Sequence, residues 1–428
     1  MNLKRIITSG KYIPEIDGLR FIAILSVLLF HIPGNFVRNV GASGHVHSQP
    51  AALGAATGPL AAMYSWTSPA FEFGVEGVLL FFCISGFILS LPFARHYLLG
   101  EQSVSLRKYF VRRLTRLEPP YIIAMSALLL GGCALGRFDL TEQLPHFAAS
   151  LCYLHNIVYG HSSTINNAAW SLEVEVQFYI LAPILCWLAF RKRRLACLLL
   201  PIAIMGCASS VATTSMTTNT LAKYLHYFLA GVGAGGIYVA KPAWFVSRAS
   251  WADAGFCAAT AAVGLVAHGD RLPRELLLPI CFGAMLLCAL KSRWISVVLR
   301  WPMIAQSGGM CYTTYLYHGR LLTLPIVFIF SRIALTNSRD SDIMLATLLL
   351  VPFVFAASIP LFLWFEKPFM NPNWPVEWMQ RLRRTELASA ESDAPFGLGA
   401  TAVSQCVPAG TGLCSVRRRR ARRLTCCS

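Results

Sequence analysis

The sequence predicts an all-α fold, a polytopic membrane helix bundle with about ten transmembrane spans and both termini in the cytoplasm. Composition is the first observation behind this prediction. Of 428 residues, 55% are hydrophobic and only 13% are charged, whereas roughly a quarter of the residues of a soluble domain are charged. Apolar stretches also recur at about 20 residues, the length of helix that crosses the hydrocarbon core. The lipid bilayer is therefore an expected partner of this chain.

Each predicted span follows from one of these apolar stretches. We place the spans at residues 19–37, 72–92, 119–136, 170–190, 195–212, 221–240, 251–268, 275–291, 306–330 and 343–365. Residues 144–158 are moderately apolar but short, so they are predicted to form a re-entrant or interfacial segment. Residues 1–370 then form one membrane domain. Residues 371–428 form a cytoplasmic tail that we expect to be disordered after about residue 385.

The basic residues support this topology. With a cytoplasmic N-terminus, eighteen Lys and Arg before residue 366 lie on the cytoplasmic side and seven lie outside, which is the bias expected of membrane proteins. The net charge of +17 is explained in the same way, because the basic residues form short runs between apolar stretches. We therefore expect no nucleic-acid partner.

Cysteine spacing gives no indication of a metal site. Ten of the fourteen cysteines lie between Cys83 and Cys311, mostly singly within apolar stretches, where a free Cys packs as a small hydrophobic residue. No Cys or Cys/His group has the spacing of zinc ligands. We predict no metal and no tightly bound cofactor.

The first span carries ionisable residues that are expensive in hydrocarbon and therefore candidates for function. Arg20 and His31 are eleven residues apart, which is about three helical turns, so both side chains lie on one face about 16 Å apart along the axis. Asp17 is placed to pair with Arg20. His31 is a candidate general base, because the pKa of imidazole lies near neutrality. The competing interpretation of a lone His on a helix is a hydrogen-bonded core residue.

A basic cluster follows the second span. Arg112, Arg113 and Arg116 share one helical face in a predicted cytoplasmic loop, and Pro119 and Pro120 are expected to begin the next helix. Two interpretations remain open at this point. The arginines either anchor the topology or bind phosphate oxygens, which the arginine fork matches.

Further polar residues occur in or beside the later spans. On a helix, Glu173 shares a face with Gln177, and Glu175 shares another face with Tyr179. His318 is a second candidate base, although packing in the core is the preferred interpretation. Glu366 and Lys367 are interpreted as an interfacial helix end. The remaining candidate site residues are Glu76, Trp170, Ser171, Glu173, Glu175, Tyr179 and His318.

Taken in order, these motifs resemble the integral-membrane acyltransferase-3 family, which O-acylates bacterial surface polysaccharides, lipopolysaccharide, peptidoglycan and some secondary metabolites. The resemblance covers roughly residues 10–370. It rests on Ile16–Arg20 with His31, Gly74–Glu76 with Phe81–Phe87, Arg112–Arg116 with Pro119–Pro120, Trp170–Tyr179, and Tyr312–His318 with Glu366–Pro368. Family members commonly have Asp where Glu76 stands, and a second carboxylate where Val176 stands. Glu173 is a candidate substitute for that missing charge.

The resemblance implies a membrane acyltransferase domain over residues 1–370, in the inner (cytoplasmic) membrane. The implied reaction moves an acyl group, commonly acetyl, from acyl-CoA to a hydroxyl of a glycan or glycan-like acceptor. It also implies that Arg20 and His31 are essential and that the donor is reached from the cytoplasm. Our hypothesis adds Asp17 and Glu175 to the catalytic site and places the CoA phosphates near Arg112, Arg113 and Arg116. Some members carry an extracytoplasmic hydrolase-like domain. None occurs in this sequence, so we expect either complete transfer by this chain or a separate transfer partner.

Two mechanisms and one rival function remain open from the sequence. His31 either deprotonates the acceptor hydroxyl directly or carries the acyl group covalently in a relay. The rival function is a polytopic exporter of a glycan or lipid. Such transporters commonly contain internal structural repeats, and residues 1–190 and 191–370 show no convincing repeat.

Overall fold

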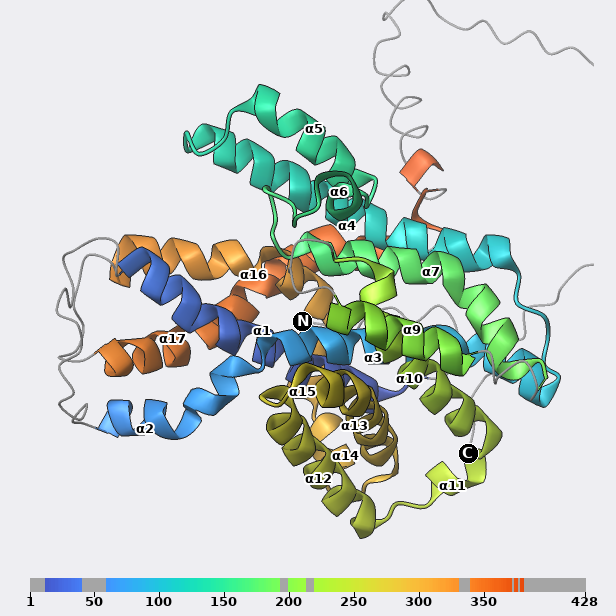
Figure 1. Cartoon of the computed structure of the whole chain (residues 1–428). Coiled ribbons are helices and arrows are strands. Elements are labelled where there is room, and N and C mark those ends of the chain that lie inside the picture. The colour runs from blue at the N-terminus through green and yellow to red at the C-terminus, as the bar shows by residue number, and fades with distance from the viewer. Residues whose placement is uncertain are drawn as a thin grey trace, which may run out of the picture. The chain divides into compact units, whose positions relative to one another are not determined.

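The computed structural model describes residues 12–40, 59–192, 199–212, 219–330, 339–371, 373–375 and 378–380. Within these ranges the chain is helical and contains no strand, only an isolated bridge between Ala249 and Ser292 (Figure 1). Seven described helices are long and apolar enough to cross a membrane. The predicted all-α, polytopic membrane bundle is therefore confirmed, whereas the count of ten spans and the side of each terminus stay predictions.

Every predicted span overlaps an observed helix. The long helices are α1 (Pro14–Val40), α3 (Gly74–Leu99), α4 (Leu106–Ala134), α7 (Ala169–Phe190), α9 (Leu199–Ala212), α10 (Leu221–Ala240), α12 (Ser250–Ala267), α13 (Arg271–Lys291) and α17 (Arg339–Leu361). The shorter ones are α2 (Pro59–Thr67), η2 (Ser68–Glu72), α5 (Leu140–Leu151), α6 (His155–Tyr159), α11 (Pro242–Val246), α14 (Ile295–Leu299), α15 (Pro302–Gly309), α16 (Cys311–Pro325), η3 (Ile326–Phe330), η4 (Phe362–Glu366) and η5 (Lys367–Met370).

Helix α3 lies inside the bundle and packs closely against α10 and α1 (Figure 1). Small residues make this approach possible. A Cβ on Gly86 would lie 2.1 Å from the Phe228 carbonyl oxygen, and a Cβ on Gly231 would lie 1.9 Å from that of Cys83. Beside this crossing, the Phe82 and Phe228 rings stack with centroids 4.7 Å apart. The close packing fixes the helix along which the candidate site is built.

The basic cluster lies on a helix and not in a loop, which corrects the prediction that a helix begins at Pro119. Helix α4 begins at Leu106 and contains both prolines. A proline inside a helix lacks the N–H that would bond the carbonyl four residues earlier. For Pro119 that carbonyl belongs to Thr115, and it accepts a hydrogen bond from the Trp374 indole at 3.0 Å instead. A distant side chain therefore replaces a missing backbone donor.

Residues 144–158 fall on α5 and α6, which are both short. Helix α5 has 12 residues, about 18 Å at 1.5 Å per residue, while the hydrocarbon core is about 30 Å thick. This length fits the predicted segment that does not cross. Asp139 caps the start of α5, and hydrogen bonds from the Thr141 hydroxyl and from the Glu142 and Thr141 N–H groups lower the pKa of Asp139.

The chain divides into two compact units, Met1–Pro375 and Val376–Ser428. All the helices named above belong to the first unit. In the second, residues 378–380 are described and are helical. The predicted disordered tail after about residue 385 lies outside the described residues.

Candidate functional site

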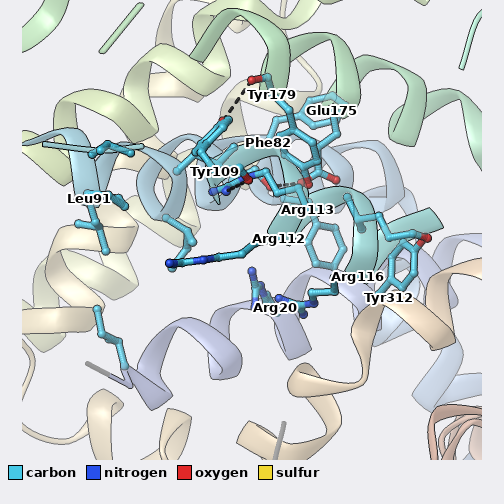
Figure 2. A pocket seen from close by; sticks show the side chains of 18 of the residues that line it. Arg20, Phe82, Leu91, Tyr109, Arg112, Arg113, Arg116, Glu175, Tyr179 and Tyr312 are labelled. Carbon is cyan, nitrogen blue, oxygen red and sulfur yellow. Dashed lines mark hydrogen bonds between the residues drawn. The ribbon is translucent and has the colours of Figure 1, made fainter. Parts of the chain in front are cut away.

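A cavity of about 640 Å³ opens among α1, α3, α4, α7, α15 and α16 (Figure 2). Its lining follows α3 from Val78 to Arg95, about 25 Å along the helix axis at 1.5 Å per residue. At the Arg95 end the lining includes the connection from Glu101 to Ser105. At the Val78 end it includes Phe81 and residues of α7 and α16. The cavity is therefore long and runs parallel to α3.

Positive charge dominates the charged lining of this cavity. The charged lining residues are the cations Arg20, Arg95, Lys108, Arg112, Arg113 and Arg116 and the carboxylates Glu101 and Glu175. The three α4 arginines of the predicted donor site are all among them, and they lie around the same open space as Arg20 in Figure 2. Among the described residues, no carboxylate forms an ion pair with these three arginines. The cavity therefore suits an anionic ligand.

Arg113 is held by aromatic and backbone groups. Its guanidinium carbon lies 3.8 Å from the centroid of the Tyr109 ring, and Nη1 donates to the Tyr109 carbonyl at 3.1 Å. The Tyr109 hydroxyl in turn donates to the Tyr179 carbonyl at 3.1 Å. A cation held over an aromatic face keeps its charge without a neighbouring carboxylate. Arg113 is thus fixed in place, with its charge available to a ligand.

The predicted pair in the first span is present. Arg20 Nη1 lies 3.1 Å from Asp17 Oδ1. The Arg20 side chain lines the cavity, whereas Asp17 is buried beneath it with an exposed fraction of 1%. Gly308 of α15 packs against the Asp17 carbonyl so closely that any side chain there would clash. Asp17 therefore orients Arg20 and does not itself face the cavity.

The two carboxylates of α7 lie on different faces, as their spacing predicts. Glu175 and Tyr179 line the cavity, where the Ser85 hydroxyl donates to Glu175 Oε1 at 2.5 Å. Glu173 is fully buried on another face. Its Oε2 accepts hydrogen bonds from the Asn156 N–H at 2.8 Å and the Asn156 side-chain amide at 2.9 Å. Glu173 therefore fastens α6 to α7 and does not line the cavity. Its role as the substitute for the carboxylate missing at Val176 stays a prediction.

His31 lies beyond the cavity, since it is not among the lining residues. It is half-buried, and its Nδ1 lies 2.8 Å from the Val27 carbonyl oxygen. Because a carbonyl only accepts, Nδ1 carries the hydrogen and the lone pair of neutral His31 is on Nε2. Nε2 is therefore the nitrogen able to accept a proton.

His318 lies between His31 and the cavity wall. The rings of His31 and His318 are 4.9 Å apart, and the His318 and Tyr315 rings are 5.5 Å apart. Tyr315 lines the cavity, and its hydroxyl forms a 2.6 Å hydrogen bond with that of Ser171. The Tyr312–His318 motif could have drawn attention to Tyr315. Only the structure shows that Tyr315 separates the cavity from the two histidines.

The course of α16 gives the same order along the bundle. Cys311, at its start, lines the cavity with Arg20. Near its end, the Thr323 hydroxyl donates to Asn35 Oδ1 of α1 at 3.2 Å. Helix α16 thus runs beside α1 in the same direction, so Tyr315 lies between the levels of Arg20 and His31.

Most of the chain matches a known protein family. The model of the Acyl_transf_3 family, described as an acyltransferase domain, matches residues 13–367. The chain belongs to the acyltransferase-3 family. No solved structure matches it.

Several curated relatives of this acyltransferase-3 chain are named O-acetyltransferases. The peptidoglycan O-acetyltransferase OatA of Listeria monocytogenes is 27% identical over 218 residues, 48% of this chain and 29% of the relative. The putative peptidoglycan O-acetyltransferase YrhL of Bacillus subtilis is 26% identical over 184 residues, 40% of this chain and 23% of the relative. The O-acetyltransferase OatA of Staphylococcus aureus is 26% identical over 187 residues, 41% of this chain and 25% of the relative. The matches thus span less than a third of these relatives.

Three other motif residues of this acyltransferase-3 chain lie away from the cavity lining. Glu76 forms an ion pair with Arg274 at 2.8 Å. Trp170 packs its ring against Tyr224, with centroids 5.4 Å apart. Glu366 is fully buried and accepts hydrogen bonds from the backbone and hydroxyl of Thr313, at 3.1 and 2.5 Å. These hydrogen bonds join Glu366 to α16, and its place at a membrane interface stays a prediction.

The sequence did not single out Arg274, the partner of Glu76, or its neighbour Glu275. Glu275 accepts hydrogen bonds from His226 at 3.1 Å and Tyr227 at 2.9 Å. No group of three or more His, Cys, Asp or Glu side chains in the described part of the chain has the geometry to hold a metal ion.

Proposed function

We propose that this acyltransferase-3 protein transfers an acetyl group from acetyl-CoA to a hydroxyl of a glycan such as peptidoglycan. One observation carries the proposal: a cation-rich cavity extends along α3 to Tyr315, whose ring meets that of His318, and the His318 ring in turn meets that of His31. The names of the relatives support acetyl as the group and peptidoglycan as the acceptor. Family membership favours this enzyme over an exporter.

The charge distribution supports acyl-CoA as the donor. Its phosphates are matched by the guanidinium groups of Arg112 and Arg116 on the α4 wall of the cavity, since arginine forks bind phosphate oxygens. The pantetheine arm would follow the apolar lining of α3, which includes Ile88 and Leu91. This orientation directs the thioester toward Tyr315. In the predicted topology the donor enters from the cytoplasm.

Arg20 is better placed to orient the donor than to stabilise the reacting carbonyl. It lies about three turns, or 16 Å along the axis, from His31, which is too far for both to contact one carbonyl group. Its guanidinium lines the cavity beside the α4 arginines. We therefore assign Arg20 to the donor and His31 to the acceptor.

The proposed chemistry uses the free nitrogen of His31. Nε2 takes the proton of the acceptor hydroxyl, and the oxygen attacks the thioester carbonyl carbon. The C–S bond then breaks, the acetyl ester forms, and the CoA thiolate leaves and takes up a proton. In the relay alternative, Nε2 attacks the thioester carbonyl first, the C–S bond breaks and the CoA thiolate leaves. The acceptor oxygen then attacks the acetyl-histidine, the N–C bond breaks, and the proton of the hydroxyl is taken up by the thiolate.

The proposal is tested with purified protein in nanodiscs, radiolabelled acetyl-CoA and soluble peptidoglycan fragments. Wild type should label the fragments and release free CoA in equal amounts, whereas His31→Ala should do neither. His268→Ala is the matched control, because His268 is exposed and lies outside the cavity. Labelling by His31→Ala at the wild-type rate would contradict the role of His31. Absence of labelling of any glycan hydroxyl by wild type, alone or with membrane extract as a source of a transfer partner, would contradict the function.

The same preparation separates the two mechanisms. Wild type is incubated with acetyl-CoA and no acceptor, and the peptide containing His31 is analysed by mass spectrometry. An acetylated His31 would support the relay, and an unmodified peptide from protein active in the acceptor assay would support direct attack.

A further inference from the structure

Two aromatic side chains, Tyr315 and His318, lie between the donor cavity and the proposed base His31. The cavity lining ends at Val78, Phe81 and Tyr315, and neither His318 nor His31 belongs to it. The Tyr315 ring is 5.5 Å from the His318 ring, and the His318 ring is 4.9 Å from that of His31. An acyl group held in the cavity therefore meets the Tyr315 ring before it meets either histidine.

Tyr315 is held firmly at this end of the cavity. It is 8% exposed, and its hydroxyl forms the 2.6 Å bond with Ser171 on α7. Its ring also meets the Phe81 ring of α3, with centroids 6.2 Å apart and a tilt of 71°. Side chains from three helices, Tyr315 of α16, Ser171 of α7 and Phe81 of α3, thus form this end of the cavity. Its shape does not depend on the rotamer of one flexible side chain.

We propose that Tyr315, fixed by Ser171, determines the length of the acyl group that the enzyme transfers and restricts the donor to short chains such as acetyl. This inference rests on the proposed function. With the donor phosphates at the α4 arginines, the acyl carbons beyond the thioester carbonyl point at the Tyr315 and Phe81 rings. Each added methylene must then displace a packed ring, and overpacking of this kind is costly.

The decisive variant is Tyr315→Val, which removes the ring. We expect the ratio of kcat/KM for butyryl-CoA to that for acetyl-CoA to rise at least about tenfold, since two methylenes then have room in an apolar pocket. Tyr315→Phe keeps the ring and loses only the bond to Ser171. Its ratio should stay within about threefold of wild type if ring volume sets the limit.

The matched control is Tyr317→Val, the same change on the same helix at a residue outside the cavity lining. It should leave the chain-length ratio unchanged. If Tyr315→Val does not fold, as judged by size-exclusion chromatography, Phe81→Val widens the same end of the cavity and should raise the ratio in the same direction.

The outcome distinguishes this inference from the proposed function. Wild-type protein that transfers nothing from acetyl-CoA would contradict the function itself. Wild-type protein that transfers acetyl, together with folded Tyr315→Val and Phe81→Val variants whose chain-length ratios equal that of wild type, would overturn only the role of Tyr315. Equal increases in Tyr315→Val and Tyr317→Val would overturn it as well.

Discussion

Two groups of charged residues in this membrane protein differ in how their charges are balanced. In the outer cluster, formed by Glu76, Arg274, Glu275, His226 and Tyr227, both carboxylates have partners: Glu76 pairs with Arg274, and Glu275 accepts from His226 and Tyr227. In the cavity, six cations face two carboxylates, and only Arg20 among the six has an ion pair, with Asp17 beneath the lining, among the described residues. Charges removed from water are costly unless they are paired. The outer cluster therefore joins helices, whereas the cavity lacks negative charge that a ligand would supply.

The position of the proposed base sharpens this comparison. His31 belongs to neither group, because its neighbours are the Val27 carbonyl and the rings of Phe30 and His318. The Val27 carbonyl holds the hydrogen of a neutral imidazole on Nδ1, which leaves Nε2 able to accept a proton. We thus assign donor binding to the cavity, proton transfer to His31 and stability to the outer cluster.

The largest expected effect is on proton transfer. His31→Ala should lower kcat for acetyl transfer by about a thousandfold, within the range that a positioned base contributes. Donor KM should stay near the wild-type value, because His31 lies outside the cavity. Steady-state kinetics in nanodiscs measure both constants. A large rise in KM with unchanged kcat would place His31 in the donor site instead.

The next effect concerns the excess positive charge of the cavity. The double change Arg112→Gln and Arg116→Gln should raise the KM for acetyl-CoA about 100-fold, since each charge-assisted hydrogen bond contributes about 1.5–3 kcal/mol. Added salt should weaken donor binding less in this variant than in wild type. Arg271→Gln, which removes one positive charge at an exposed arginine outside the cavity, is the control. Equal KM values in all three proteins would indicate that the α4 arginines anchor the membrane topology and do not bind the donor.

Breaking a pair in the outer cluster should affect stability and not donor binding. Glu76→Gln leaves Arg274 without its carboxylate and should lower the free energy of unfolding by about 2–3 kcal/mol, somewhat below the cost for a fully buried pair because Arg274 is partly exposed. Thermal unfolding in detergent measures the loss, and adding Arg274→Gln should restore part of it. A changed acetyl-CoA KM at an unchanged melting temperature would show that the cluster binds substrate.

The smallest expected effect concerns the hydrogen bond from Trp374 to α4, the helix that carries the basic cluster. Trp374→Phe removes the hydrogen bond to the Thr115 carbonyl, which should cost about 1 kcal/mol and raise donor KM less than threefold. Thermal unfolding and the donor titration check both values. Stability equal to wild type would mean that water or another donor satisfies this carbonyl.

Features of the site that depend on spacing within one helix could be predicted from the sequence. The Asp17–Arg20 pair and the separation of Glu175 from Glu173 follow from helical periodicity, and both are observed. A membrane bundle could be predicted for a similar reason, because the hydropathy of each apolar stretch indicates a span without knowledge of the other stretches.

Features that join distant segments could not be predicted in this way. Helix α4 continues through Pro119 because Trp374 satisfies a carbonyl 259 residues away. Glu366 is buried because Thr313 of another helix donates to it. The arrangement of Tyr315 between the cavity and His31 likewise depends on how α1, α3, α7 and α16 pack. No local pattern encodes these contacts.

The most direct test is a cryo-electron microscopy map of His31→Ala bound to acetyl-CoA, with an antibody fragment as a size marker. The account predicts density for the nucleotide beside Arg112 and Arg116 and a pantetheine arm along α3 that ends at Tyr315. A map in which acetyl-CoA occupies another surface, or in which this cavity holds no ligand at saturating donor, would contradict it.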